Sequence, residues 1–366
     1  MGFNCGIIGL PNVGKSTLFN ALSATTSADT ANYAFCTIEP NVGRVAVPDP
    51  RLEEIAALTK SARITPAHLE FVDIAGLVRG AGKGEGLGNQ FLSHIREVDA
   101  VLHVLRCFES GDVTHVEGSV DPVRDAEIVD IELMLADLES LERRVVALTK
   151  KVQGGEKTFS AELALMERAK KTLEEGRPAW MMPIEAEEQP LFKQLQLITA
   201  KPTLFVANVG EEITGQCNAH LKAAEFYAKE RGAGLIVTSA AIEAEVAGLE
   251  SPDERADFLD TLGLKETGLV RVIQAGYALL GLLTFFTATL KEARAWTIEK
   301  GVKAHQAAGI IHTDFTRGFI AAETIGFQDF IACKGQQGTK DAGKMRLEGR
   351  DYVIQDGDVL LFRFNV

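Results

Sequence analysis

The sequence predicts an α/β fold with a mostly parallel sheet and a phosphate-binding loop, together with a helical insertion and a separate β-rich segment at the end of the chain. Three observations support this prediction. Short apolar runs bounded by turn residues alternate with helical stretches, at residues 3–9, 69–74, 100–105, 203–209 and 235–239. The first run leads into a Gly-x-x-x-x-Gly-Lys-Ser segment. A regular heptad spacing marks the stretch after residue 128.

Length and composition indicate a soluble protein of more than one domain. A chain of 366 residues exceeds what one ordinary core holds, so two or three domains are expected. No apolar run reaches the roughly 20 residues of a membrane-spanning helix, and residues 1–6 lack the pattern of a secretory signal. The five cysteines are scattered without Cys-x-x-Cys spacing, which is typical of a reducing compartment. We therefore expect a cytoplasmic protein without a membrane partner.

The charge of the chain is spread unevenly. The formal net charge is −13, which argues against general nucleic-acid binding by the whole molecule. Residues 281–366 hold 11 Lys and Arg against 10 Asp and Glu, so the preceding residues carry a net charge of −14. A surface that faces RNA is therefore expected in the C-terminal part, with Lys344, Arg346 and Arg350 as candidate contacts. The alternative is a solvated basic loop.

Residues 128–200 interrupt the alternation of strands and helices. Seven apolar residues follow a 3-4-3-4 spacing for about three heptads: Ile131, Met134, Leu138, Leu141, Val145, Leu148 and Val152. Gly154-Gly155 ends this seam, and a second helical stretch follows at residues 159–173. The pattern predicts an antiparallel helical hairpin inserted into the α/β domain, rather than two ordinary surface helices.

The residues after 281 change character again. They form short apolar runs broken by Gly and Asp, and Asp356-Gly357 separates two runs rich in β-forming residues. This pattern predicts a small β-rich domain with a hairpin or turn at Asp356-Gly357.

The segment from Gly9 to Ser16 has the composition of a P-loop. A predicted strand precedes it and a predicted helix follows it, which is the context that the motif requires. Its glycines let successive backbone N–H groups and the helix N-terminus point at an anion. Lys15 is then expected to neutralise the β- and γ-phosphates, and the Ser16 hydroxyl to ligate Mg²⁺.

A second motif, Asp73-x-x-Gly76, lies at the end of the next strong strand. Behind a P-loop, an aspartate at this place holds Mg²⁺ through water, and the glycine N–H senses the γ-phosphate. Thr37 is the expected second hydroxyl ligand of the metal, with Thr25 and Thr30 as rivals on position alone. The glycine-rich residues 80–88 that follow are expected to form a mobile switch, or else a surface loop without a role.

Base recognition departs from that of GTPases. Those enzymes carry Asn-Lys-x-Asp after a strand, whereas this chain has Asn208-Val209-Gly210-Glu211. Glutamate is one methylene longer than aspartate, so guanine hydrogens would be poorly paired, at a cost of about 1–3 kcal/mol for each unsatisfied group. Adenine lacks the N2 amino group, so the sequence predicts a preference for ATP. Ser239 begins the turn that is expected to contact the base or the sugar.

Several motifs in this order and spacing resemble the YchF, or Obg-like ATPase, family. They are residues 9–16, 32–41, 71–77, 80–89 and 208–211. The resemblance covers the whole chain. It implies an OBG-type nucleotide-binding domain at 1–127 and 201–280, a helical coiled-coil insert at 128–200, and a β-grasp TGS domain at 281–366.

The resemblance also implies an activity and a partner. It implies an ATPase that prefers ATP to GTP, needs Mg²⁺, and associates with the large ribosomal subunit through the TGS domain and the insert. The expected nucleotide contacts are Asn12, Val13, Gly14, Lys15, Ser16, Thr17, Gly76, Asn208, Val209, Glu211 and Ser239. The expected metal ligands are Ser16, Thr37 and Asp73.

One catalytic part is missing from the sequence. Many GTPases carry Gln after Asp-x-x-Gly to orient the attacking water, and Leu77 stands there in this chain. His115, in an acidic and glycine-rich loop, is a candidate substitute, although a solvated loop histidine is the favoured interpretation. Asn12 could ligate a K⁺ ion near the phosphates, or could simply form the turn.

Three functions therefore compete at this point. The first is a nucleotide-switched, ribosome-associated ATPase with slow turnover. The second is a regulatory module that uses ATP as a structural cofactor, which Leu77 favours. The third, a metabolic kinase, lacks a recognisable acceptor site and general base.

Overall fold

The computed structural model describes residues 3–24, 41–74, 87–110, 115–211, 218–249 and 251–365. The chain divides into two compact units. The first consists of Met1–Arg44 with Glu70–Val272, and the second of Val45–Leu69 with Ile273–Val366.

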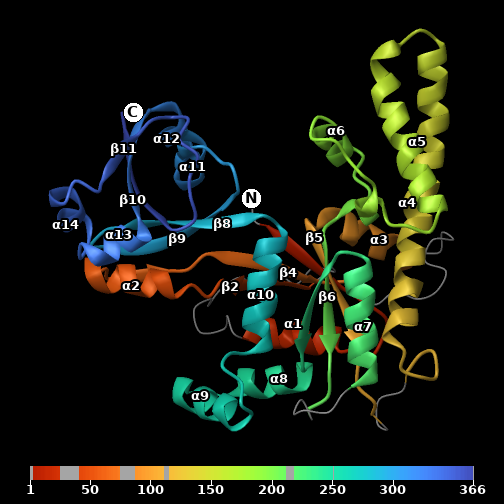
Figure 1. Cartoon of the computed structure of the whole chain (residues 1–366), viewed down its shortest axis with the longest axis horizontal. Helices are drawn as coiled ribbons and strands as arrows, with labels where there is room; N and C mark the ends of the chain where they lie inside the picture. Colours follow the sequence, from red (N-terminus) through yellow and green to blue (C-terminus); the bar gives the residue numbers. More distant parts are fainter. Residues whose placement is uncertain are drawn as a thin grey trace. The chain divides into compact units, whose positions relative to one another are not determined.

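The first unit is built on a six-stranded sheet of order β2-β4-β1-β5-β6-β7 (Figure 1). The pairs β1–β4, β1–β5, β5–β6 and β6–β7 are all parallel, as the alternation of strands and helices predicts. The strands are β1 (Asn4–Ile8), β2 (Asn41–Ala46), β4 (His68–Asp73), β5 (Ala100–Arg106), β6 (Thr203–Asn208) and β7 (Gly234–Thr238).

Helices connect these strands, as parallel pairing requires. Every residue of β5 is buried, which explains why its sequence reads as a continuous apolar run. The helices in this part of the chain are α1 (Lys15–Ala24), α3 (Leu87–Glu97), α4 (Pro122–Gln153), α5 (Ser160–Glu174), α6 (Gln189–Gln194), α7 (Ala219–Glu230), α8 (Ala240–Gly248), α9 (Pro252–Thr261) and α10 (Gly268–Leu279), and the last three follow the final strand of the sheet.

The inserted hairpin consists of α4 and α5, which pack side by side (Figure 1). Asp121 caps α4 by accepting from Val123 N–H and Arg124 N–H, and the helix runs for 32 residues to the turn at Gly154. Most of the predicted seam is confirmed, because Met134, Leu141 and Leu148 are buried, and Leu138 and Val145 pack against them. Ile131 is wrong as a seam residue, since it is 50% exposed.

A buried carboxylate closes the base of the hairpin. Asp137 on α4 accepts hydrogen bonds from the backbone N–H groups of Ile198 (2.9 Å) and Thr199 (2.7 Å), and from the Thr199 hydroxyl (2.7 Å). Arg144 donates to the Leu195 carbonyl oxygen of the returning chain at 2.7 Å. These contacts fix where the insertion rejoins the sheet, immediately before β6.

The second unit contains a mixed six-stranded sheet of order β11-β10-β12-β8-β9-β3. Its core gathers Phe285, Ile298, Leu360 and three alanines of α11, all of them buried. The elements are α2 (Pro50–Thr59), β3 (Arg63–Thr65), β8 (Leu282–Ala288), β9 (Glu292–Glu299), α11 (Ala304–Ile311), α12 (Thr313–Arg317), β10 (Phe319–Gly326), α13 (Phe327–Ala332), α14 (Gln336–Asp341), β11 (Arg346–Glu348) and β12 (Asp358–Phe364).

Residues 45–69 lie in this second unit, whereas the sequence places them in the nucleotide-binding domain. β3 adds to the edge of β9 in parallel. Arg51 of α2 binds Asp49 (2.8 Å) and Asp356 (2.6 Å), and its guanidinium lies 5.3 Å from the centre of the Phe286 ring. The sequence could not reveal this pairing, because the partners are more than 200 residues apart in the chain.

The turn predicted at Asp356-Gly357 is present, but it does not join a hairpin. Gly357 has a φ of 85°, and Asp356 Oδ1 accepts from Thr284 N–H at 2.9 Å. The strand that follows, β12, pairs with β10 and β8 rather than with the chain before the turn. The residues Asp356-Gly357 predict a turn from local sequence alone. Which strands β12 pairs with depends instead on the packing of the whole sheet.

Among the described residues, no helix combines the length and the apolar character that crossing a membrane requires.

Candidate functional site

The P-loop joins β1 to α1 in a conformation that its residue types explain. Gly9 and Gly14 have positive φ values of 146° and 98°. A Cβ on Gly14 would lie 2.2 Å from Asn208 Nδ2, and one on Gly9 would lie 2.5 Å from the Val104 carbonyl oxygen. Asn12 also has a positive φ, of 61°, which asparagine tolerates. The loop therefore needs glycine at both ends because neighbouring groups approach its backbone closely.

Lys15 is held in place inside this loop. Its ammonium group is buried and donates to the Leu10 carbonyl oxygen at 2.7 Å. Burial lowers the pKa of Lys15 to about 8, and the nearby Asp73 carboxylate partly offsets that shift. An anion beside Lys15 would favour the charged form of the amine, so phosphate binding and protonation of Lys15 support each other.

Two predicted metal ligands lie together at the ends of the loop and of β4. The Ser16 hydroxyl donates to Asp73 Oδ2 at 3.2 Å. Mg²⁺ is usually held by one or two carboxylates or hydroxyls together with phosphate oxygens and water, and this donor pair fits that pattern. The described residues contain no group of three or more His, Cys, Asp or Glu side chains placed to hold a metal without a phosphate. Thr37 and Gly76, the other expected contacts, fall outside the described residues.

The side chain of Asn208 joins the P-loop to the start of α8. Its Nδ2 donates to the Val13 carbonyl oxygen at 2.8 Å, and its Oδ1 accepts from Ala240 N–H at 2.9 Å. Asn208 is only 4% exposed. Both ends of its carboxamide are therefore engaged by the backbone of two walls of the site.

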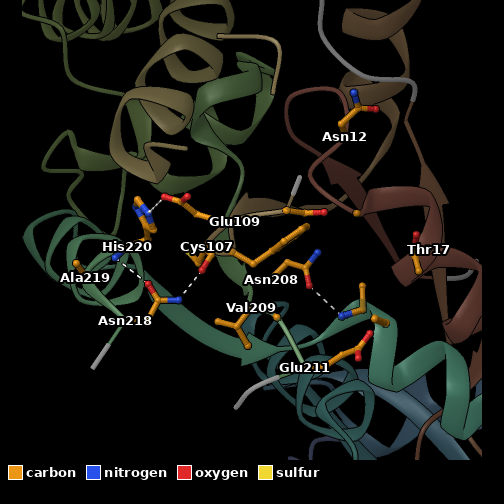
Figure 2. Close-up of a pocket in the computed structure, with 16 residues that line it drawn as sticks. Asn12, Thr17, Cys107, Glu109, Asn208, Val209, Glu211, Asn218, Ala219 and His220 are labelled. Carbon is orange, nitrogen blue, oxygen red and sulfur yellow. Dashed lines mark hydrogen bonds and ion pairs between the residues drawn. The ribbon is translucent and has the colours of Figure 1, made fainter. Parts of the chain in front are cut away.

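These elements surround a pocket of about 1000 Å³ (Figure 2). Of the residues predicted from the sequence, the lining includes Asn12, Gly14, Thr17, Asn208, Val209 and Glu211. Ser239 does not line it. Its buried hydroxyl borders a separate cavity of about 180 Å³ beside Glu243, while Ala240 and Ala241 form the wall of the main pocket.

One wall of the pocket was not predicted from the sequence, and it is formed by residues 107–110 and 218–220. Asn218 Nδ2 donates to the Cys107 carbonyl oxygen at 2.5 Å, and His220 Nε2 lies 3.3 Å from Glu109 Oε1. A general rule could have found the first segment, because ligands of parallel sheets bind where strands end, and β5 ends at Arg106.

The buried side chain of Arg106 contacts Phe108, a residue of this wall. It is 1% exposed, its Nε donates to the Phe108 carbonyl oxygen at 3.1 Å, and its guanidinium lies 4.6 Å from the centre of the Phe108 ring. Burial lowers the pKa of Arg106, and Asp125 and Glu109 oppose that shift.

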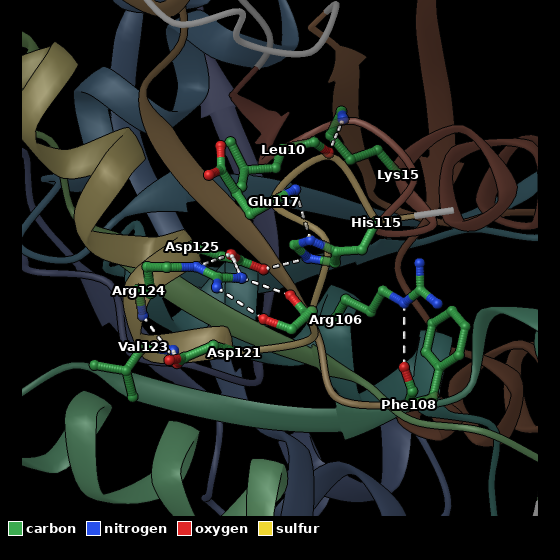
Figure 3. A network of polar contacts seen from close by, with 11 residues as sticks. Leu10, Lys15, Arg106, Phe108, His115, Glu117, Asp121, Val123, Arg124 and Asp125 are labelled. Atoms are coloured by element: carbon green, nitrogen blue, oxygen red, sulfur yellow. Dashed lines mark hydrogen bonds and ion pairs between the residues drawn. The ribbon is translucent and has the colours of Figure 1, made fainter. Parts of the chain in front are cut away.

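His115 is not the solvated loop histidine that the sequence analysis favoured. It is 8% exposed, and its Nε2 lies 2.7 Å from Asp125 Oδ2 (Figure 3). Leu77, whose place lacks the usual glutamine, falls outside the described residues.

The predicted RNA contacts lie in the second unit, and two of them have partners within the chain. Lys344 binds Asp329 at 2.7 Å. Arg346 binds Glu348 at 3.2 Å and donates to the Tyr352 hydroxyl at 3.0 Å. Arg350 is exposed.

Comparison with known proteins agrees with the fold. Residues 4–150 match a family model described as "50S ribosome-binding GTPase", and residues 282–365 match the model of the YchF GTPase C-terminal region, described as "Protein of unknown function (DUF933)". The chain is 52% identical to the ribosome-binding ATPase YchF of Escherichia coli O157:H7 and 50% identical to that of Bacillus subtilis, with 100% of each chain covered.

A solved structure extends this agreement to three dimensions. The YchF GTPase of Schizosaccharomyces pombe superposes with a TM-score of 0.89 at 37% identity, over 99% of this chain and 98% of that one. Sequence and fold thus agree over the full length, and the chain belongs to the YchF family.

Proposed function

We propose that the protein is a Mg²⁺-dependent P-loop ATPase that acts as a nucleotide-dependent switch on the ribosome. One observation carries the enzymatic part: the P-loop, whose Asn12, Gly14 and Thr17 line the pocket, also holds the buried amine of Lys15 and the Ser16 hydroxyl that contacts Asp73. The name "ribosome-binding ATPase" of the bacterial relatives supports both parts.

Each residue has a distinct role in this proposal. Lys15 neutralises the β- and γ-phosphates, and the backbone N–H groups of Val13 and Gly14 cradle them. Ser16, Asp73 and Thr37 hold Mg²⁺, which supplies charge stabilisation to the phosphate oxygens when it is bound. The N–H of Gly76 senses the γ-phosphate.

The preference for ATP rests on the residues after β6. Val209 and Glu211 line the pocket where GTPases place lysine and aspartate. Without that aspartate, the imino and amino hydrogens of guanine lose a paired acceptor, while adenine has no such pair to satisfy. The backbone of Val209 and Gly210 then lies beside the adenine edge.

Calorimetric titration in Mg²⁺ buffer tests this proposal. ATP should bind at least about fivefold more tightly than GTP, since one unsatisfied polar group costs about 1–3 kcal/mol. Equal or tighter binding of GTP would overturn the assignment of the base site.

Two variants separate the phosphate site from the base site. Lys15→Ala should weaken ATP and GTP alike by at least tenfold, because it removes a charge-assisted contact worth about 1.5–3 kcal/mol. Glu211→Asp combined with Val209→Lys should instead change the ratio of the two affinities toward GTP. A Lys15→Ala protein that binds ATP like the parent would refute the P-loop assignment.

Turnover is proposed to be slow, because Leu77 cannot orient the attacking water. Unassisted hydrolysis in a small GTPase is on the order of 10⁻⁴ per second. In this proposal His115 supplies the water-positioning group, and Asn12, which lines the pocket, ligates an activating K⁺ ion. A module that holds ATP without hydrolysing it is the competing function.

Single-turnover hydrolysis distinguishes these functions. His115→Ala should lower the rate at least tenfold while leaving ATP affinity unchanged, since the group acts only on the transition state. His94→Ala, on α3 and apart from the pocket lining, is the matched control and should hydrolyse ATP like the parent. A parent without measurable turnover in K⁺, with or without ribosomes, would favour the non-hydrolysing module.

Docking on the large ribosomal subunit is proposed for the second unit, together with the hairpin. The charge balance of residues 281–366 supports this unit as the contact surface, and the description of the family model that matches residues 4–150 supports the ribosome as the partner. Lys344 pairs with Asp329 and Arg346 pairs with Glu348, so an acidic side chain partly neutralises each of these charges. Arg350 and Lys340 are exposed, and we propose that they contact phosphates.

Co-sedimentation with ribosomes at increasing salt tests this surface. Arg350→Glu with Lys340→Glu should reduce the amount of protein that pellets with ribosomes. It should also make the logarithm of the binding constant fall less steeply with the logarithm of salt concentration, because fewer phosphate contacts mean that fewer counterions are released on binding. Lys300→Glu, an exposed site in the same unit, is the charge-matched control. If the double variant pellets like the parent at every salt concentration, the helical hairpin becomes the better candidate.

A further inference from the structure

Both ring nitrogens of His115 are engaged by the chain itself (Figure 3). Nδ1 accepts a hydrogen bond from Glu117 N–H at 3.1 Å, and Nε2 lies 2.7 Å from Asp125 Oδ2. A backbone N–H can only donate, so Nδ1 is unprotonated and the ring proton lies on Nε2, which donates to Asp125. In this conformation neither nitrogen is available to a water molecule.

Asp125 is a fixed and buried partner. It lies in the first turn of α4, and its backbone N–H donates to the Asp121 carbonyl oxygen at 3.0 Å. Its other oxygen, Oδ1, accepts from Arg124 at 3.1 and 3.3 Å. The side chain of Asp125 is 2% exposed and that of His115 is 4% exposed, so water does not compete for the bond between them.

We propose that Asp125 is a positioning residue that holds His115 in a resting position, and that this bond must break before His115 can orient the attacking water. The inference rests on the proposed role of His115 in hydrolysis. A charge-assisted bond inside the protein is among the stronger hydrogen bonds, so the resting position dominates. The rate of the free enzyme then scales with the fraction of molecules in which the bond is open.

The inference gives Asp125 and His115 opposite effects on turnover. Asp125→Ala removes the acceptor and should raise ATP hydrolysis without ribosomes at least fivefold, with unchanged ATP affinity. Asp125→Asn keeps the shape and a neutral acceptor, so its rate should lie between those of the parent and of Asp125→Ala. The double variant Asp125→Ala with His115→Ala should be as slow as His115→Ala alone, since the gain operates through the histidine.

Asp121→Ala is the matched control on the same turn of α4. It removes the helix cap from Val123 N–H and Arg124 N–H without touching His115, so it should lower the melting temperature but leave turnover unchanged. A comparable rise in this control would mean that loosening α4, rather than freeing His115, accelerates hydrolysis, and it would overturn the inference.

Nitrogen NMR of the full-length protein gives a readout that does not depend on activity. The parent should show His115 with Nε2 protonated and Nδ1 unprotonated, and the Asp125→Ala protein, in which Nε2–H has lost its acceptor, should show the Nε2 signal of a solvent-exposed imidazole. An unchanged His115 signature in a folded Asp125→Ala protein, or an Asp125→Ala protein with equal or lower turnover, would overturn the positioning role. If His115→Ala itself hydrolyses ATP like the parent, the failure lies in the proposed function instead.

Discussion

The carboxamide of Asn208 is the contact on which the site depends. It donates to the Val13 carbonyl oxygen of the P-loop and accepts from Ala240 N–H at the start of α8. The two segments are joined to different strands, β1 and β7, and Asn208 ends the strand β6. One buried side chain therefore links the P-loop to the opposite wall of the pocket, and Gly14 must be glycine because Asn208 Nδ2 occupies the space of a side chain.

The other side chains of the site are also held by contacts within the chain, but these contacts differ in which atoms they leave available. Lys15 is buried against the Leu10 carbonyl oxygen, and Arg106 fixes the Phe108 carbonyl oxygen beside the pocket. His115 is also buried, but its contacts occupy the atoms that a catalytic role would need. The P-loop and the walls of the pocket are thus fixed by buried contacts, while both ring nitrogens of His115, the group proposed for hydrolysis, are engaged within the chain.

The parts of the molecule that could be predicted from the sequence are those whose structure is determined by residues close together in the chain. Glycines at fixed spacing between a strand and a helix identified the P-loop, and heptad spacing identified α4, although Ile131 lies outside the seam. The parts that it could not predict depend on distant partners. Examples are residues 45–69, which join the second unit through Arg51 and Asp356, and His115, whose burial depends on Asp125 of the next helix.

Nucleotide affinity of the Asn208→Ala protein tests the central claim most directly. Loss of two hydrogen bonds worth about 0.5–1.5 kcal/mol each should weaken ATP and GTP binding by a similar factor, roughly five- to 150-fold, and leave their ratio as in the parent. That result, measured by calorimetry on a protein that circular dichroism shows to be folded, would mean that Asn208 joins the walls of the pocket without reading the base. A changed ratio of ATP to GTP affinity, or affinities equal to those of the parent, would contradict the account.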